Sequence, residues 1–227
     1  MPGHAPGPFR SRTFGVAWSA LYELAYEGLE SVAAVLFRPL FRVRRTAGPY
    51  HLPRGGVILC PNHQSYLDPA FVQLVVDRRL TFVMTDDFYS VRGARWFFRI
   101  VRAMPVGRGR LAARTVRRAA ALLRTGGALV VFPEGRLSVT GELSRAQRGV
   151  AVLARRGRAP VVPVAIEGSM RAWPKGAHWF RHADVRVAVG RPIRWSGPPE
   201  REREQAFADE VLARVAALRA AMPATRP

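Results

Sequence analysis

The sequence has almost no cysteine, and its histidines are scattered. Cys60 is the only cysteine among 227 residues. A single cysteine excludes an internal disulfide and a cysteine-rich metal site. His51, His178 and His182 have no ligand-like companions, so we expect no metal site.

Long apolar runs are also missing. No stretch reaches the roughly 18–20 uninterrupted apolar residues of a transmembrane helix. Glu23, Glu27 and Glu30 interrupt the only region that could resemble the apolar part of a signal peptide. We therefore expect neither a membrane-spanning helix nor a cleaved leader.

Acidic residues are scarce relative to basic ones. The chain has 36 Lys and Arg against 16 Asp and Glu, a formal net charge of +20, and Lys175 is its only lysine. A field this positive attracts anions, and guanidinium groups bind phosphate in a bidentate manner. Nucleic acid, anionic lipid and acidic carrier proteins are all candidate partners on charge alone.

The order of apolar segments predicts the fold class. Strand-like runs alternate with helical patterns, which favours the α/β class with a mostly parallel sheet flanked by helices. The expected strands are 56–60, 80–84, 128–132, 160–166 and 184–189, and the expected helices are 69–76, 111–124, 144–156 and 200–221. Pro160 and Pro163 predict that 160–166 lies at an end or edge of the sheet.

The first 47 residues differ in character from the rest. Residues 1–12 read as a loose tail, and 14–37 have a helical apolar pattern, followed by interleaved aromatics and arginines from Phe37 to Arg45. One interpretation is an amphipathic membrane-associating helix; the other is a helix packed on the protein's own core. We divide the chain into this segment (1–47) and an α/β domain with a C-terminal helix (48–227). Residues 93–102 are a second basic, aromatic candidate for membrane contact.

His63 and Asp68 follow an expected strand, where α/β sheets present functional side chains. Across a strand–turn–helix corner the carboxylate can hold one imidazole nitrogen and leave the other free to take a proton. The spacing alone equally suits an Asp68 that caps a helix, with Pro69 at its first position, beside a polar loop histidine. Asn62 would hydrogen-bond the turn backbone.

Two further loops carry charge. Glu134 and Arg136 follow the expected strand 128–132 and could contact a polar substrate or simply be solvated. Arg108 and Arg110 lie between glycines before a helix, where a guanidinium suits a phosphate, although a solvated basic loop has the same pattern. Cys60, at the end of an apolar strand, fits a buried hydrophobe better than a nucleophile.

Four short blocks occur together, and their combination resembles the glycerolipid (lysophospholipid) acyltransferase family. The blocks are Asn62-His63-x-x-x-x-Asp68-Pro69, Met104-Pro105-Val106-Gly107-Arg108, Phe132-Pro133-Glu134-Gly135 and Val162-Pro163-Val164-Ala165-Ile166. The resemblance covers roughly residues 50–193.

The resemblance implies a role for each matching residue. His63 would be the catalytic base and Asp68 would orient it. Arg108 would contact the phosphate of the acceptor, and Asn62, Glu134, Gly135 and Arg136 would line the substrate site. Pro163 would bind the acyl donor or shape the site. No cofactor is implied beyond the co-substrate, acyl-CoA or acyl-carrier protein.

The activity that the resemblance implies is acyl transfer to a lysophospholipid hydroxyl, most of all that of 1-acylglycerol 3-phosphate. The enzyme would be a peripheral or monotopic protein on the cytoplasmic face of an anionic phospholipid membrane. No nucleic-acid partner is expected. Two departures leave the acceptor open. Arg136 stands one place earlier than the family's usual third-block arginine, as in domains that reacylate lysophosphatidylethanolamine, and Gly107 replaces a common Asp. Glycerol 3-phosphate, an ornithine lipid or a glycolipid are other acceptors, and a non-catalytic basic membrane- or nucleic-acid-binding protein is the alternative from another class.

Overall fold

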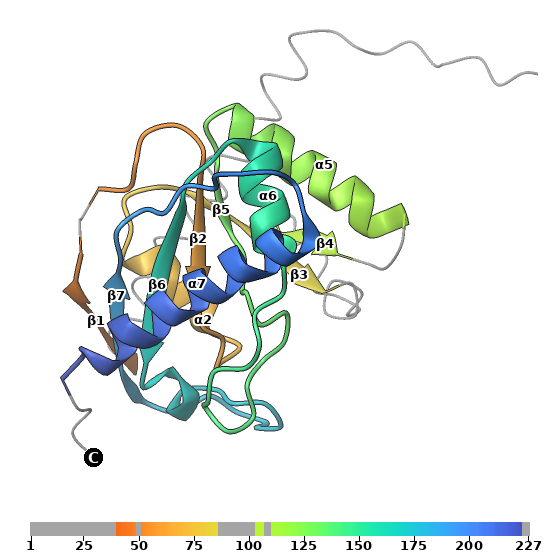
Figure 1. Cartoon of the computed structure of the whole chain (residues 1–227). Coiled ribbons are helices and arrows are strands. Elements are labelled where there is room, and N and C mark those ends of the chain that lie inside the picture. The colour runs from red at the N-terminus through yellow and green to blue at the C-terminus, as the bar shows by residue number, and fades with distance from the viewer. Residues whose placement is uncertain (1–39, 49–50, 86–102, 107–109, 224–227) are drawn as a thin grey trace, which may run out of the picture.

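A seven-stranded sheet forms the centre of the molecule (Figure 1). The computed structural model describes residues 40–48, 51–85, 103–106 and 110–223. Along the sheet the strands run in the order β1-β7-β6-β2-β5-β3-β4. Their bounds are β1 Phe41–Ala47, β2 Val57–Pro61, β3 Leu80–Thr85, β4 Met104–Val106, β5 Ala128–Val130, β6 Val161–Glu167 and β7 Ala183–Val189.

The sheet is mostly parallel, as the alternation of strands and helices predicted. β6 and β7 pair antiparallel, and all the other neighbouring strands pair in parallel. Because β6, β2 and β5 are neighbours that run the same way, their carboxyl ends lie side by side. The loops after these three strands therefore meet at the carboxyl end of the sheet.

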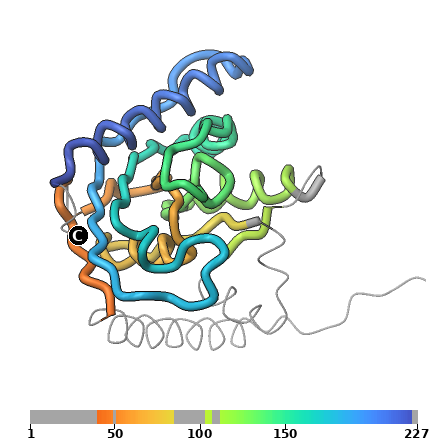
Figure 2. Tube along the Cα trace, turned by 90° about the horizontal axis from the view of Figure 1, so that it is seen from below, coloured from red at the N-terminus to blue at the C-terminus, as the bar shows by residue number. Residues whose placement is uncertain are grey.

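Helices cover both faces, and β2 shows why. Its five residues are all buried, and successive side chains point to opposite faces. Val57 and Leu59 pack with Phe71 of α2 (Asp68–Leu74). Ile58 packs on the other face with residues of α5 (Arg110–Arg124), α6 (Gly149–Gly157) and α7 (Arg201–Ala220). In Figure 2 these three helices lie on one side of the sheet and α2 on the other.

Of the two predicted positions for 160–166, an end or an edge, the edge is wrong, since β6 lies between β7 and β2, whereas Pro160 does stand at an end, directly before Val161. Pro163 is tolerated there because its missing N–H falls where the pairing with β7 ends: the antiparallel ladder begins at Val164↔Val189. The carbonyl of Pro163 still accepts a hydrogen bond from the backbone N–H of Gly190, 2.8 Å away. An interior strand can therefore contain a proline where one of its two ladders stops.

Part of the predicted N-terminal segment belongs to the sheet. Phe41–Ala47 is the edge strand β1, paired in parallel with β7, so the division after residue 47 is wrong at this point. Phe41 is buried against Phe71, with ring centroids 5.3 Å apart. The expected helix over 14–37 and the basic segment 93–102 lie outside the described residues. Within the described part of the chain, no helix is both long and apolar enough to cross a bilayer.

Candidate active site

The His63–Asp68 pair meets across the corner between β2 and α2. His63 Nδ1 lies 3.0 Å from Asp68 Oδ2. The same oxygen accepts hydrogen bonds from the backbone N–H groups of Gln64 (2.6 Å) and Ser65 (2.8 Å). The simple helix-cap interpretation is wrong: Leu67 is the N-cap, Asp68 is already helical, and its carboxylate reaches back into the loop rather than onto the helix N-terminus. Asp68 is fully buried, so its charge acts on the imidazole in a low-dielectric setting.

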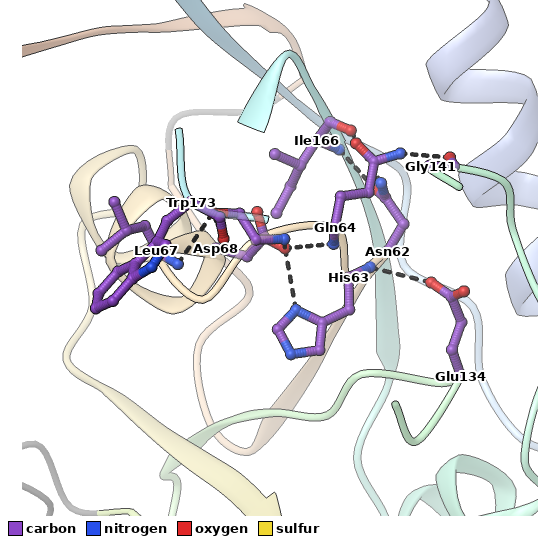
Figure 3. A network of polar contacts seen from close by, with 10 residues as sticks. Asn62, His63, Gln64, Leu67, Asp68, Glu134, Gly141, Ile166 and Trp173 are labelled. Atoms are coloured by element: carbon purple, nitrogen blue, oxygen red, sulfur yellow. Dashed lines mark hydrogen bonds and ion pairs between the residues drawn. The ribbon is translucent and has the colours of Figure 1, made fainter. Parts of the chain in front are cut away.

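The imidazole of His63 is fixed on one side and open on the other. Its ring stacks on that of Phe132, with centroids 3.9 Å apart and planes 22° from parallel. With Nδ1 donating to Asp68, Nε2 is the proton-accepting nitrogen. Among the described residues no group bonds Nε2, and 19% of the side chain is exposed. Figure 3 shows the ring pointing away from the surrounding polar contacts. This is the geometry of an oriented general base whose reactive nitrogen is accessible.

Glu134 supports the backbone of the same histidine. Its Oε1 accepts the backbone N–H of His63 at 3.0 Å, and its Oε2 accepts both the N–H and the hydroxyl of Ser144, at 2.9 and 3.0 Å. The carboxylate is only 3% exposed. The backbone N–H of Ser138 also donates to the carbonyl of His63 at 2.8 Å. The loop after β5 therefore holds the histidine through both its backbone N–H and its carbonyl; Figure 3 shows the bond to Glu134.

These contacts explain why α6 begins later than predicted. Helical apolar spacing favoured a start at Ser144, whereas α6 begins at Gly149. The N–H of Ser144 is bound to Glu134, and the N–H of Gln147 donates to the carbonyl of Pro133 at 2.7 Å. Residues 144–147 are thus bonded to the loop after β5, and the helix begins beyond them.

Asn62 and Gln64, on either side of His63, tie the corner to two other segments. The side-chain amide of Asn62 donates to the carbonyl of Ile166 at 2.9 Å and accepts its N–H at 2.7 Å. Gln64 Nε2 donates to the carbonyl of Gly141 at 2.6 Å. Arg219, near the end of α7, donates to that same carbonyl at 2.7 Å and pairs with Glu167. The loops after β2, β5 and β6 are thus cross-linked around the histidine.

The expected substrate-contacting residues divide into two groups. Asn62 and Glu134 are buried with their polar atoms bonded to other groups of the protein, so they position the corner, and their contact with the acceptor stays a prediction. Pro163 is buried in β6 opposite Cys60, which fits a shaping role. Arg136 is exposed and makes no hydrogen bond or ion pair with the described residues, so its guanidinium can meet an anion. Arg108 lies outside the described residues.

Gly135 separates these two groups. Its φ is +66°, in the left-handed region that glycine adopts most easily. The turn sends the side chain of Glu134 inward and leaves Arg136 on the surface. Gly135 itself is exposed, so its backbone can approach a substrate closely.

Cys60 is not available as a nucleophile. It is fully buried in β2. Burial, and secondarily the charge of Glu134, raises the pKa of its thiol far above the ordinary value. The described part of the chain also holds no group of three or more His, Cys, Asp or Glu side chains that could share a metal ion. Acid–base chemistry at His63 is what the described residues offer.

Four contributors to this site escaped sequence reasoning. Phe132 was named as the end of a strand and as part of the block Phe132-Pro133-Glu134-Gly135, with no role of its own, and Gln64, Ser144 and Arg219 carried no signal. Gln64 contacts the backbone carbonyl of Gly141, and the backbone N–H of Ser144 contacts Glu134; such contacts recur at no fixed distance along a sequence. Arg219 lies 78 residues from the carbonyl that it binds. No local pattern could have identified it.

Comparison with known proteins gives consistent results. A sequence model of the family described as Acyltransferase matches residues 43–167. A chloroplastic 1-acyl-sn-glycerol-3-phosphate acyltransferase of Brassica napus is 28% identical over 135 residues, which are 58% of this chain and 39% of that protein. The chain therefore spans well under half the length of the plant relative. A Bacillus subtilis protein of the same name is 23% identical over 165 residues, 71% of this chain and 79% of that protein.

A solved structure has the same fold. The crystal structure of the 1-acyl-sn-glycerophosphate acyltransferase PlsC from Thermotoga maritima superposes with a TM-score of 0.70. The match covers 96% of this chain and 86% of that one, at 23% identity. At this identity the likeness supports the arrangement of sheet and helices, and the chemistry must be argued from the residues.

Proposed function

Since the chain belongs to the Acyltransferase family, whose match spans the His63 corner and the Glu134 loop, we propose that it transfers a fatty acyl group from a thioester donor to the free hydroxyl of 1-acylglycerol 3-phosphate. The product would be phosphatidic acid. The donor would be acyl-CoA or acyl-carrier protein. The names of the relatives from Brassica napus and Bacillus subtilis support this choice of acceptor.

The observation that carries the proposal is the fixed, one-sided imidazole of His63. Nδ1 is held by buried Asp68, and Nε2 is accessible. Nε2 takes the proton of the acceptor hydroxyl as its oxygen attacks the thioester carbonyl carbon. Asp68 stabilises the imidazolium that forms. When the intermediate collapses, the carbon–sulfur bond breaks and the thiolate leaves with that proton, so the base returns to its starting state.

The chain needs no covalent acyl-enzyme in this scheme. The thioester is already activated, and the only thiol of the chain, Cys60, is buried and protonated. Holding the hydroxyl next to both Nε2 and the thioester supplies a large part of the rate enhancement. Arg136, with Arg108 beyond the described residues, would hold the phosphate and so place the hydroxyl.

A membrane location follows from the substrate. The acceptor and the product are lipids, whereas the thioester donors are found in the cytoplasm. The enzyme would therefore work as a peripheral or monotopic protein on the cytoplasmic face of an anionic membrane, where a net charge of +20 favours binding.

A mixed-acceptor assay tests the proposal. Purified full-length protein is given acyl-CoA, in parallel acyl-carrier protein, and an equimolar pool of lysophosphatidate, lysophosphatidylethanolamine and glycerol 3-phosphate, and the products are identified by mass spectrometry. Phosphatidic acid is expected as the main product. Main acylation of lysophosphatidylethanolamine, which the early position of Arg136 also suggests, would overturn the acceptor assignment, and absence of any acylated product would overturn the activity.

Arg136 has a matched control in the same loop. R136Q is expected to raise the KM for lysophosphatidate about tenfold or more, because it removes a charge-assisted phosphate contact. Arg145 is exposed as well and lies nine residues downstream, and R145Q is expected to leave KM within about twofold. Equal effects of the two substitutions on KM would show that Arg136 acts only through the overall positive charge and does not contact the phosphate.

A further inference from the structure

The loop over residues 172–182, between β6 and β7, exposes two adjacent aromatic side chains. Trp179 is 78% exposed and Phe180 is 49% exposed, and among the described residues few other large apolar side chains are exposed. A single exposed apolar residue needs no explanation, whereas adjacent aromatic rings facing water indicate a contact surface. We call this segment the aromatic loop.

The charged side chains in and beside the aromatic loop are all basic. Arg171, Lys175 and Arg181 are exposed in and beside it. No acidic residue occurs from 168 to 183. Amphipathic aromatic rings flanked by cations are the composition of segments that lie at the interface of an anionic bilayer.

The aromatic loop is attached directly to the catalytic corner. The carbonyl of Trp173 accepts the backbone N–H of Tyr66 at 3.1 Å and the hydroxyl of Ser65 at 3.2 Å. The rings of Tyr66 and Trp173 meet edge to face, with centroids 5.6 Å apart. Tyr66 lies between His63 and Asp68 in the sequence, so the aromatic loop is bonded to the segment that joins these two residues.

Its own hydrogen bonds give the aromatic loop a fixed shape. The N–H of Arg181 donates to the carbonyl of Ala172 at 2.8 Å and closes the loop at its base. Trp173 Nε1 donates to the carbonyl of Ala177 at 3.0 Å. Phe180 packs edge to face on Phe41 and Trp173, each with centroids 6.3 Å away. A preformed loop loses little entropy when its tip enters another phase.

The position of the aromatic loop matches the direction from which a lipid must arrive. Figure 1 shows it, in blue, beyond the same end of the sheet as the loop that follows β5 and carries Glu134. The loop after β5 exposes Val139, which is 63% exposed. Apolar and cationic groups therefore gather at the end of the sheet to which His63 belongs.

From these contacts we infer that the aromatic loop is a docking surface for an anionic phospholipid bilayer, with Trp179 and Phe180 entering the interface and Arg171, Lys175 and Arg181 meeting the headgroups. This rests on the proposed function for its biological purpose and supplies a physical route from bilayer to base. The segments that the sequence indicated for membrane contact were 14–45 and 93–102, and this surface is additional to them.

Binding of the full-length protein to vesicles, without substrate, tests the inference. The vesicles are neutral phosphatidylcholine, or phosphatidylcholine with about one third phosphatidylglycerol. W179A and W179A/F180A are expected to lower the partition coefficient about threefold and about tenfold or more, since apolar area no longer enters the interface. Trp179 is so exposed that W179A cannot unfold the protein, whereas Phe180 also packs inward.

The charge component has a matched control. R171Q/K175Q/R181Q is expected to lower binding to the anionic vesicles about a hundredfold, because each cation near the surface contributes about 1 kcal/mol, and to change binding to neutral vesicles little. R114Q/R117Q/R118Q removes three exposed charges from α5 instead. That control is expected to lower binding less than about threefold.

Three results would overturn the inference. The first is that W179A/F180A binds vesicles as well as the wild-type protein does. The second is that the charge variants of the loop and of α5 lose equal amounts of vesicle binding. The third is that the loop variants keep vesicle binding and lose only self-association or binding to an acidic carrier protein. Failure of the proposed function gives a different pattern: loop-dependent vesicle binding by a protein that acylates no lysophosphatidate. The two claims are therefore separable.

Discussion

A hydrogen bond of 3.0 Å runs from the backbone N–H of His63 to Oε1 of Glu134, a residue 71 positions further along the chain. It places a buried carboxylate behind the backbone of the base while Asp68 holds its ring. The third block of the family thus contributes to the site through the conformation of the first. This relationship gives Glu134 a positioning role that can be distinguished from substrate contact.

E134Q tests that role. A glutamine retains one acceptor oxygen, so its amide N–H must face either the N–H of His63 or the two donors of Ser144. We expect kcat to fall about 10–100-fold with acceptor KM nearly unchanged, because a charge-assisted hydrogen bond becomes a donor–donor conflict. Steady-state kinetics with varied acceptor give both parameters.

S144A is the milder companion to E134Q. It removes the hydroxyl and leaves the backbone N–H of residue 144 on Glu134 Oε2, so a change in kcat of less than about threefold is expected. A higher acceptor KM in E134Q at unchanged kcat would show instead that the carboxylate contacts the substrate.

Arg219 links the C-terminal helix to the catalytic loops. R219A removes a donor from the carbonyl of Gly141 and leaves Glu167 without its cation. We expect kcat to fall about three- to tenfold at constant acceptor KM, with partial recovery in R219K, because the carbonyl of Gly141 then keeps only the hydrogen bond from Gln64 among the described residues. Arg214, on the same helix, forms an exposed i,i+4 pair with Glu210 and provides the control R214A, which should retain the wild-type kcat. Equal losses in both variants would point to general weakening of α7.

Cys60 is predicted to be dispensable for chemistry. Burial raises the pKa of its thiol, so it stays protonated at neutral and mildly alkaline pH. The folded protein should resist iodoacetamide up to about pH 9, and C60A should transfer acyl groups within about twofold of the wild-type rate. Mass spectrometry of the treated protein measures alkylation. Rapid alkylation of the native enzyme, or an acyl adduct on Cys60, would contradict this assignment.

The sequence was sufficient to predict most of the sheet because its strands are buried. Parallel strands covered on both faces appear as short apolar runs, and β2, β3, β5 and β6 all had that signature. β1 was missed because arginines that alternate with Phe41 and Val43 at a sheet edge resemble an amphipathic interfacial segment. The position of β6 was misjudged because a proline rule that holds for continuous ladders does not apply where one ladder ends.

The site was predictable only in part, for a related reason. His63 and Asp68 are five residues apart, so a short motif could suggest that they meet. The carboxylate of Glu134 could be recognised as part of the site, but its burial and its partners depend on the tertiary fold. The contacts of Arg219 and of the aromatic loop join segments with no periodic relationship. Sequence therefore indicated that His63 and Asp68 meet and named Asn62 and Glu134, and it missed the contacts of Gln64, Ser144 and Arg219 that hold the corner in place.

The rate of acyl transfer by H63A tests the central claim most directly, with D68N as its partner. In D68N an amide oxygen can still accept the three hydrogen bonds now made by Asp68 Oδ2, so the substitution removes chiefly the charge. With acyl-CoA and lysophosphatidate under saturating conditions, we predict a fall of about 10²–10⁴-fold for H63A and a substantial fall for D68N, both with wild-type vesicle binding. Full acyl transfer by H63A would contradict the account.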